Sequence, residues 1–311
     1  MINMSFSKET KTELCKIQIH NKEEETAIVY GMVLFSRTFS ASSLSLTTEC
    51  QPVARTFSEM LSSLTGTIVE LEINLTRRGG ENRIFSLTVP DKNECAKIFD
   101  FFGHSPKQLN LRINRANIDN DDCIALFLRG AFLACGNVTN PEKDYHLEFV
   151  VPHKNLASDL EKIISEIEEI NTEPHIVNRK GSYIVYIKGS ENIADMLTYI
   201  GAPMASLTIM QKKMLKSVRN NINRKINSET ANINKTATAS AKQLYAINII
   251  KEKRGLNYLP DDLKALAIIR LENPEYNLRE LGAALSPPIS RSGVNHRLQR
   301  IMSIAEELSD K

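Results

Sequence analysis

Four polar side chains near the C-terminus have the types and spacing of a site that reads nucleic-acid bases. Arg291, Ser292, Asn295 and His296 follow Ser290, a residue type that favours the position just before a helix. On such a helix the four side chains would project from the first two turns. Arginine and asparagine each form paired hydrogen bonds with guanine and adenine edges. We therefore predict that these four residues contact bases and that the backbone N–H at Ser290 binds phosphate.

The elements that must position this cluster follow helix-turn-helix patterning. Helices are predicted over about 261–272, 277–285 and 290–308, and two prolines break the chain before the last of them. The residues predicted to form the core of this module are Leu278, Leu281, Ala284, Leu285, Val294, Leu298 and Ile301. Helix-turn-helix patterning alone is a weak motif, so a plain helical hairpin with a solvated face remains an alternative.

A strongly basic region precedes the module. Residues 206–257 carry eleven Lys or Arg against two Glu, a net charge of +9. Residues 1–205 sum to −6 and residues 258–311 to −1. A basic block between near-neutral or acidic neighbours favours a polyanionic partner.

Within this block the sequence predicts a basic amphipathic helix over 208–226, a linker over 227–241 and a helix over 241–253. Lysine and arginine side chains on the helix can neutralise phosphates, although a solvated surface helix is the alternative. The residues predicted to anchor phosphates are Lys212, Lys213, Lys216, Arg219, Arg224, Lys225 and, in the C-terminal module, Arg297.

The first 200 residues read as two copies of one unit, over about 20–103 and 121–203, joined by a connector over 104–120. Landmarks recur at offsets of 99, 100 and 101 residues, namely Gly31 with Gly130, Pro52 with Pro152, and Gly80 with Gly181. Each copy is predicted to contain a glycine-centred helix, a strand, a helix, a two-stranded hairpin and a last helix. After the glycine-centred helix, the first copy has a strand over 43–48, a helix over 51–64, hairpin strands over 67–74 and 83–89, and a helix over 91–102. The second copy has a strand over 145–151, a helix over 152–170, hairpin strands over 175–178 and 183–187, and a helix over 191–200.

Both glycine-centred helices place glycine where it is costly. Gly31 and Gly130 lie inside apolar helical segments, where glycine costs about 1 kcal/mol relative to alanine. Close approach of two helix backbones would explain both positions. We therefore expect the copies to pack pseudosymmetrically through these helices, each sheet forming half of a saddle over duplex DNA.

The second glycine helix resembles a degenerate copy of the LAGLIDADG signature of homing endonucleases, reading Leu-Arg-Gly-Ala-Phe-Leu-Ala-Cys-Gly over residues 128–136. Residues 129–148 are more similar still to the WhiA family of bacterial regulators. So are Leu278-Arg-Glu-Leu-Gly282, Ser290-Arg-Ser-Gly-Val-Asn-His-Arg-Leu298 and the start, Met4-Ser-Phe-Ser-Lys-Glu9. The resemblance spans nearly the whole chain. It implies a LAGLIDADG-like domain, a linker and a C-terminal helix-turn-helix domain in a protein of transcription, cell division or chromosome segregation.

The resemblance also implies a lost catalytic centre. In active LAGLIDADG enzymes an acidic residue before the last glycine of the motif binds the divalent metal. Ser36 and Cys135 stand at the matching positions, and neither is a good Mg²⁺ ligand. Asp121 and Asp122 lie more than three turns before Cys135, where we expect them to cap the helix. Metal-dependent cleavage therefore lacks its ligands, and we predict no enzyme activity, no metal and no cofactor.

The cysteines and His296 predict no disulfide, zinc or catalytic site. Five cysteines form an odd set without a close pair, which disfavours disulfides and structural zinc, and Cys135 is expected to be an inert helical thiol. His296 has no nucleophile or orienting carboxylate beside it. No apolar run approaches the roughly 20 residues of a membrane helix, and the start has no signal-peptide core. We expect a cytoplasmic, nucleoid-associated protein.

These features predict an α+β chain with a two-repeat domain over 1–203, a basic helix and linker over 204–257 and a helix-turn-helix domain over 258–311, with its motif over about 277–308. The predicted function is non-enzymatic, sequence-selective binding of double-stranded DNA, and the resemblance implies a transcriptional regulator of cell division and chromosome segregation. The alternative is a scaffold whose acidic N-terminal domain binds a protein partner while the tail alone binds DNA. A residual nuclease and an RNA-binding protein also remain, the latter disfavoured because the predicted strands carry few aromatics.

Overall fold

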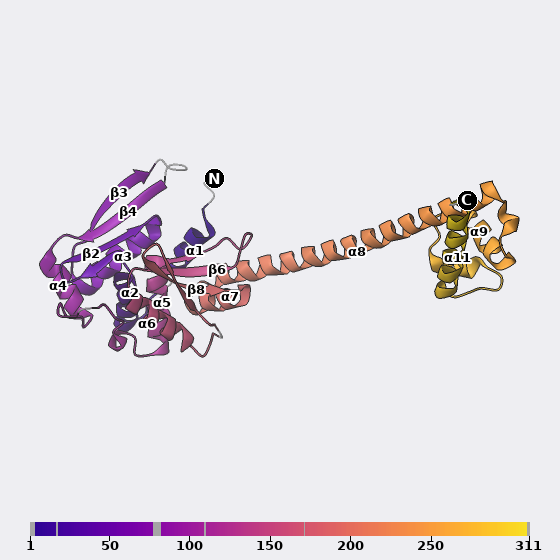
Figure 1. Ribbon diagram of the computed structural model, residues 1–311. Helices are drawn as coiled ribbons and strands as arrows, with labels where there is room; N and C mark the ends of the chain where they lie inside the picture. Colours follow the sequence, from indigo (N-terminus) through magenta and orange to yellow (C-terminus); the bar gives the residue numbers. More distant parts are fainter. Residues whose placement is uncertain (1–3, 17, 77–81, 109, 171, 310–311) are drawn as a thin grey trace. The chain divides into compact units, whose positions relative to one another are not determined.

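The computed structural model describes residues 4–16, 18–76, 82–108, 110–170 and 172–309. The chain forms two compact units, Met1–Lys216 and Ser217–Lys311 (Figure 1). The fold is α+β, as predicted: the first unit holds both β-sheets and the second is helical. Gly80, one of the recurring landmarks, lies outside the described residues.

The first unit contains the two predicted copies, each with a four-stranded antiparallel sheet. The strand orders are β1-β2-β4-β3 and β5-β6-β8-β7, so the two sheets correspond strand for strand. The first copy consists of α2 (Lys22–Leu34), β1 (Thr38–Ser40), β2 (Ser43–Thr48), α3 (Gln51–Thr65), β3 (Glu70–Thr76), β4 (Asn82–Val89) and α4 (Lys92–Phe101). The second consists of α5 (Asp121–Cys135), β5 (Gly136–Val138), β6 (His146–Val151), α6 (Lys154–Ser165), β7 (His175–Arg179), β8 (Ser182–Lys188) and α7 (Ser190–Tyr199).

Alternation along the strands gives each sheet one buried face. On β2, Leu44 and Leu46 are buried while Ser43 and Ser45 are not, and on β6 the buried positions likewise alternate. This period of two is the pattern of an antiparallel sheet packed on one side. The tight β7–β8 turn has positive φ, at 52° for Lys180 and 85° for Gly181, which is one of the recurring landmarks.

Helices α2 and α5 pack directly against each other through their glycines. A Cβ atom on Gly31 would collide with the carbonyl oxygen of Phe127, and one on Gly130 with that of Ile28. The two helices are the most extensively buried of the unit: every residue from 27 to 34 of α2 is buried. The predicted close approach of two helix backbones is therefore confirmed.

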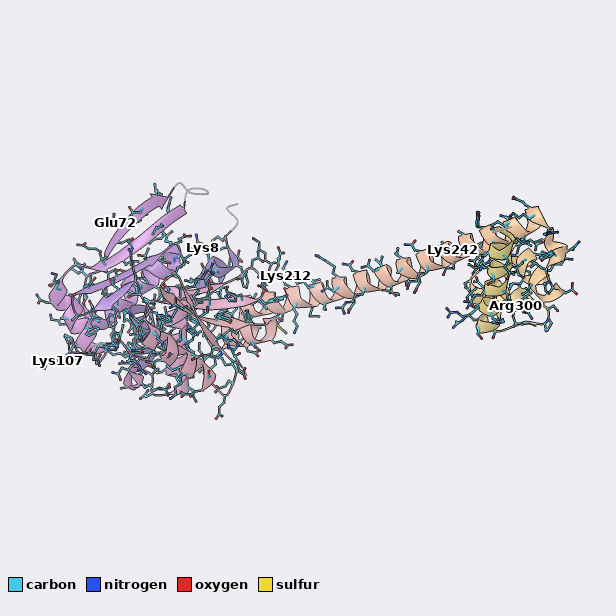
Figure 2. The ribbon with its side chains drawn as sticks, viewed as in Figure 1. Lys8, Glu72, Lys107, Lys212, Lys242 and Arg300 are labelled. Atoms are coloured by element: carbon cyan, nitrogen blue, oxygen red, sulfur yellow. The ribbon has the colours of Figure 1, made fainter. Side chains whose placement is uncertain are left out.

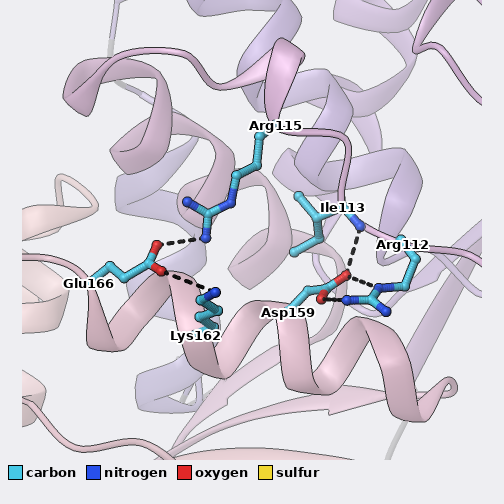
Figure 3. Close-up of polar contacts among 6 residues, drawn as sticks. All are labelled: Arg112, Ile113, Arg115, Asp159, Lys162 and Glu166. Atoms are coloured by element: carbon cyan, nitrogen blue, oxygen red, sulfur yellow. Dashed lines mark hydrogen bonds and ion pairs between the residues drawn. The ribbon is translucent and has the colours of Figure 1, made fainter.

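The connector between the copies is fixed to α6 by charged side chains (Figure 3). Arg112 binds Asp159 through two hydrogen bonds of 2.6 and 2.7 Å, and the same carboxylate accepts the backbone N–H of Ile113 at 3.1 Å. Arg115 binds Glu166 at 2.6 Å. A paired guanidinium and carboxylate with an added backbone donor fixes the path of an otherwise irregular segment.

The prediction of a linker over 227–241 is wrong. One helix, α8, runs without interruption over Pro203–Lys253 (Figure 1). The segment is rich in Asn, Thr and Ser, which favour turns when glycine or proline accompanies them, but neither occurs between 204 and 254. Ser240 and Gln243 are moreover buried within the second unit, so tertiary packing supports the helix there.

Other differences concern short or terminal elements. The N-terminal helix α1 (Phe6–Leu14) and strands β1 and β5 were not predicted, because each is only a few residues long or lacks strong periodicity. Helix α6 ends at Ser165 rather than 170, and β3 begins at Glu70 rather than 67. Asn120 caps α5, while Asp121 and Asp122 occupy its first turn.

The second unit packs α9 (Asp261–Glu272), α10 (Leu278–Ala284) and α11 (Arg291–Ser309) against the last turns of α8. Its buried core includes Leu281, Leu285, Val294, Leu298 and Ile301, as predicted. Ala284 is exposed, so its predicted place in the core is wrong. Leu278 is half-buried, so its predicted place in the core is confirmed only in part.

Candidate nucleic-acid interface

The first turns of α11 display the predicted base-reading residues. Arg291, Ser292, Asn295 and His296 are all exposed, whereas Val294 between them is buried. Helical periodicity thus assigns the polar residues to solvent and the apolar residue to the core.

Ser290 starts this helix as a cap. Its Oγ accepts the backbone N–H of Gly293 at 3.2 Å and lies 3.0 Å from the Oγ of Ser292. The first backbone N–H groups of α11 belong to exposed residues, which leaves the positive end of the helix open to an anion.

The turn before α11 depends on a close backbone contact. The backbone N–H of Ile289 donates to the carbonyl of Gly282 at 3.0 Å, and a Cβ atom on Gly282 would collide with the carbonyl oxygen of Ile289. At the start of α10, Asn277 and Glu280 cap the helix by binding each other's backbone N–H groups. The absence of a side chain at Gly282 therefore lets the segment before α11 pack closely against α10.

Arg297 has an internal partner. Its Nε lies 3.4 Å from the carboxylate of Asp262, and its Nη1 donates to the backbone carbonyl of the same residue at 3.3 Å. This predicted phosphate anchor therefore holds α11 on α9. Its guanidinium offers DNA only the donors that Asp262 does not use.

The predicted phosphate-binding residues of α8 form two groups. Lys212, labelled in Figure 2, pairs with Glu142 at 2.6 Å. Lys213 pairs with Glu191, and the ammonium of Lys216 lies 4.7 Å from the ring centre of Tyr145. These contacts all lie within the first unit. Surface ion pairs of this kind contribute about 0–1 kcal/mol, so DNA phosphates could displace them.

The other group lies on the part of α8 that belongs to the second unit. Arg219, Arg224 and Lys225 are exposed there, and none of them forms an ion pair with another described residue. They are therefore better placed than the three lysines to meet an external polyanion.

Other contacts are found at the two positions that we predicted to match the metal-binding residues of LAGLIDADG enzymes. The Oγ of Ser36 is buried and donates to the carbonyls of Val33 at 2.7 Å and Thr38 at 3.0 Å. Beside Cys135, the ammonium of Lys11 donates to the carbonyl of Leu133 at 3.1 Å. That carbonyl lies in the last turn of α5, at the negative end of the helix dipole.

Lys11, from the short helix α1, is the feature that sequence reasoning missed. Burial lowers the pKa of Lys11, and burial raises the pKa of the Cys135 thiol to about 12, so the thiol stays protonated and weakly nucleophilic near neutral pH. A lone lysine in an N-terminal helix carries no sequence signal of a contact with a residue more than 120 positions away. Its amino group lies at this end of the helix.

Restoring acidic residues at these two positions should not restore cleavage. We expect the double variant Ser36→Asp, Cys135→Asp to leave supercoiled plasmid intact in Mg²⁺ or Mn²⁺. The Ser36 side chain has no room to extend into solvent, and the Lys11 ammonium competes for any carboxylate at position 135. The measurement is plasmid nicking on agarose gels, with the wild-type chain as control. Robust metal-dependent nicking by the double variant would show that the rest of a catalytic centre is intact.

Neither a metal-binding cluster nor a membrane-spanning helix occurs in the part of the chain that the structure describes. No group of three or more His, Cys, Asp or Glu side chains there is placed to hold a metal ion. No described helix is long and apolar enough to cross a membrane. All five cysteines are free thiols.

Comparison with known proteins gives the same two-part organisation. Residues 124–219 match the family described as "WhiA LAGLIDADG-like domain", and residues 222–305 match "WhiA C-terminal HTH domain". A Clostridium botulinum protein named "Probable cell division protein WhiA" is 36% identical over 314 residues, covering 98% of this chain and 99% of its own. A protein of the same name from Thermoanaerobacter sp. (strain X514) is 38% identical over 322 residues, covering 99% of each chain.

The fold is shared with a solved relative. The crystal structure of full-length DUF199/WhiA from "Thermatoga maritima" matches with a TM-score of 0.59 and 27% identity, over 98% of this chain and 99% of that one. Both family matches, the full-length relatives and this structure agree on one arrangement. The chain belongs to the WhiA family, with a LAGLIDADG-like domain followed by a C-terminal helix-turn-helix domain.

Proposed function

We propose that this chain is a non-enzymatic protein that binds double-stranded DNA sequence-selectively and regulates transcription in cell division and chromosome segregation. The observation that carries the proposal is the exposed row Arg291, Ser292, Asn295 and His296 on the first turns of α11. These side chains can form hydrogen bonds with base edges in a major groove, and none of them is acidic. The role in cell division is supported by relatives named "Probable cell division protein WhiA".

Affinity in this proposal comes from phosphate contacts around the recognition helix. Ser290 offers its helix N-terminus, and Arg219, Arg224 and Lys225 offer exposed cations on α8. Lys212, Lys213, Lys216 and Arg297 join them by exchanging their intramolecular partners for phosphate. The proposed domain limits are 1–203, 204–257 and 258–311, and the proposed location is the cytoplasm, at the nucleoid.

A specific observation favours a second role for the first unit. Strand β3 is the outermost strand of its sheet, and its side chains Leu71, Ile73 and Leu75 are 52%, 52% and 68% exposed. Exposed apolar side chains on an edge strand are a surface that a protein partner can cover. The acidic residues Glu70 and Glu72 alternate with them, which disfavours DNA at this strand.

Removing the exposed cations of α8 should reduce the salt dependence of DNA binding. Because each phosphate contact contributes about 0.9 to the slope of log K against log salt, the triple variant Arg219→Gln, Arg224→Gln, Lys225→Gln should lower its magnitude by about 2 to 3. The measurement is fluorescence anisotropy of a labelled duplex between low and physiological salt.

The matched control for this triple variant is Asn220→Ala, Asn221→Ala, Asn223→Ala, which changes three exposed neutral positions on the same turns. We expect an unchanged slope for the control. An unchanged slope for the triple glutamine variant as well would remove this part of α8 from the DNA interface.

A further inference from the structure

A groove within the second unit has the side chains of an anion-binding site. Its volume is about 580 Å³, and it lies between residues 232–243 of α8 and the first residues of α10 and α11. Four of the residues that line it are cationic: Lys235, Arg270, Arg279 and Arg291. None of the described residues that line it is acidic. Such a concentration of positive charge in a concave site favours an anionic ligand.

Two buried side chains in this groove have polar atoms without partners. Arg270 is 2% exposed, and its Nη1 donates to the carbonyl of Tyr276 at 2.6 Å, yet its Nε has no hydrogen-bond partner among the described residues. Gln243 is 7% exposed, and its Oε1 likewise has none. Burying an unpaired polar atom costs about 1–3 kcal/mol, so both atoms fit a site that is completed by a ligand.

The kinds of polar group indicate the chemistry of that ligand. Guanidinium groups pair their N–H donors with phosphate oxygens. The amides of Asn232, Gln243 and Asn295 can form hydrogen bonds with the donors and acceptors of a nucleobase edge. The volume lies within the roughly 300–1,000 Å³ typical of small-molecule sites. Nucleoside phosphates carry both a phosphate and such a base edge.

We propose that this groove binds a nucleoside phosphate, and that the bound ligand competes with DNA for Arg291 and Asn295. Both residues line the groove and also belong to the exposed row on α11. A guanidinium engaged by phosphate in the groove cannot at the same time pair with a guanine edge. The competition rests on the proposed DNA-binding function; binding of the nucleotide in the groove does not.

The first test is direct binding of ATP, GTP and inorganic triphosphate to the full chain, measured by isothermal titration calorimetry at fixed ionic strength. Lys235→Ala and Arg279→Ala each remove one groove cation at an exposed position, and each should weaken nucleotide binding about tenfold. Arg270 is left unchanged because it also binds the backbone that follows α9.

The controls are Lys242→Ala on α8 and Arg300→Ala on α11, two exposed cations that do not line the groove (both labelled in Figure 2). We expect unchanged nucleotide affinity for both. The triphosphate without a nucleoside should bind more weakly than ATP or GTP, because it leaves the amides unpaired. Absence of binding by all three probes, or equal losses in the control variants, would overturn the assignment of the groove.

The second test is competition. A saturating concentration of the tighter nucleotide should raise the dissociation constant of a labelled duplex about tenfold in the wild-type chain, and much less in Lys235→Ala. Unchanged duplex affinity would overturn the competition. If Lys235→Ala and Arg279→Ala instead weaken duplex binding and no nucleotide binds, the groove serves backbone phosphates of DNA and the free ligand is excluded. Nucleotide binding by a chain that binds no duplex would overturn the proposed function and leave the groove assignment standing.

Discussion

Replacing Gly130 by alanine should destabilise the first unit by about 3 kcal/mol or more. Overfilling a packed site costs about 1–3 kcal/mol when neighbouring side chains can yield, but here the obstacle is the backbone of α2. The new Cβ atom would collide with the carbonyl oxygen of Ile28 and lie 2.9 Å from the backbone nitrogen of Met32. The gain of about 1 kcal/mol in helix propensity cannot offset a displacement of two core helices.

The measurement is urea denaturation followed by circular dichroism, with hydrogen exchange in α2 and α5 assigning the loss to the first unit. Gly31→Ala should behave in the same way, because its Cβ atom would meet Phe127 and Ala131 symmetrically. The matched control is Gly293→Ala, a helical glycine whose Cβ atom would find its nearest neighbour at 3.5 Å. We expect that control to be neutral or stabilising by up to about 1 kcal/mol. Equal behaviour of Gly130→Ala and Gly293→Ala would show that the helices are not in backbone contact.

The second large effect is expected on DNA recognition. Arg291→Ala should weaken binding to a preferred duplex by about 1–3 kcal/mol and relax the sequence preference, because the lost contact is with a base edge. Affinity for random DNA should change little. The measurement compares anisotropy titrations on a selected site and on random duplex, in one buffer.

Arg300→Ala, an exposed arginine further along α11, is the control for the loss of a positive charge. It should affect selected and random DNA equally, if at all. Equal losses on both duplexes for Arg291→Ala would assign Arg291 to phosphate and move base readout away from the start of α11.

Local patterns predicted most of the fold because they act through neighbouring residues. Strand β2 was predicted at its observed limits from alternation alone, and α10 was predicted within one residue of each of its observed ends. The close packing of α2 and α5 was predictable because glycine inside an apolar helix needs a structural reason, and backbone contact supplies one. The continuous α8 was mispredicted because polar residues were taken as a break in a segment without glycine or proline.

The candidate site was predictable in part for the same reason. Exposure of Arg291 and Asn295 follows from helical periodicity around the buried Val294. The contact of Lys11 with the end of α5 could not be predicted, since it joins residues 122 positions apart. Nor could the ion pairs of Lys212 and Lys213, whose glutamate partners lie 70 and 22 residues earlier in the chain.

The central claim is that the second unit carries the DNA-binding activity. It is tested most directly by the salt dependence of duplex affinity for the full chain and for two fragments, 1–216 and 217–311, which follow the division between the compact units. We predict that 217–311 binds duplex with a steep salt slope approaching that of the full chain, and that 1–216 binds weakly at physiological salt. Comparable affinity of 1–216 and the full chain would contradict the account and place the DNA on the sheets of the first unit.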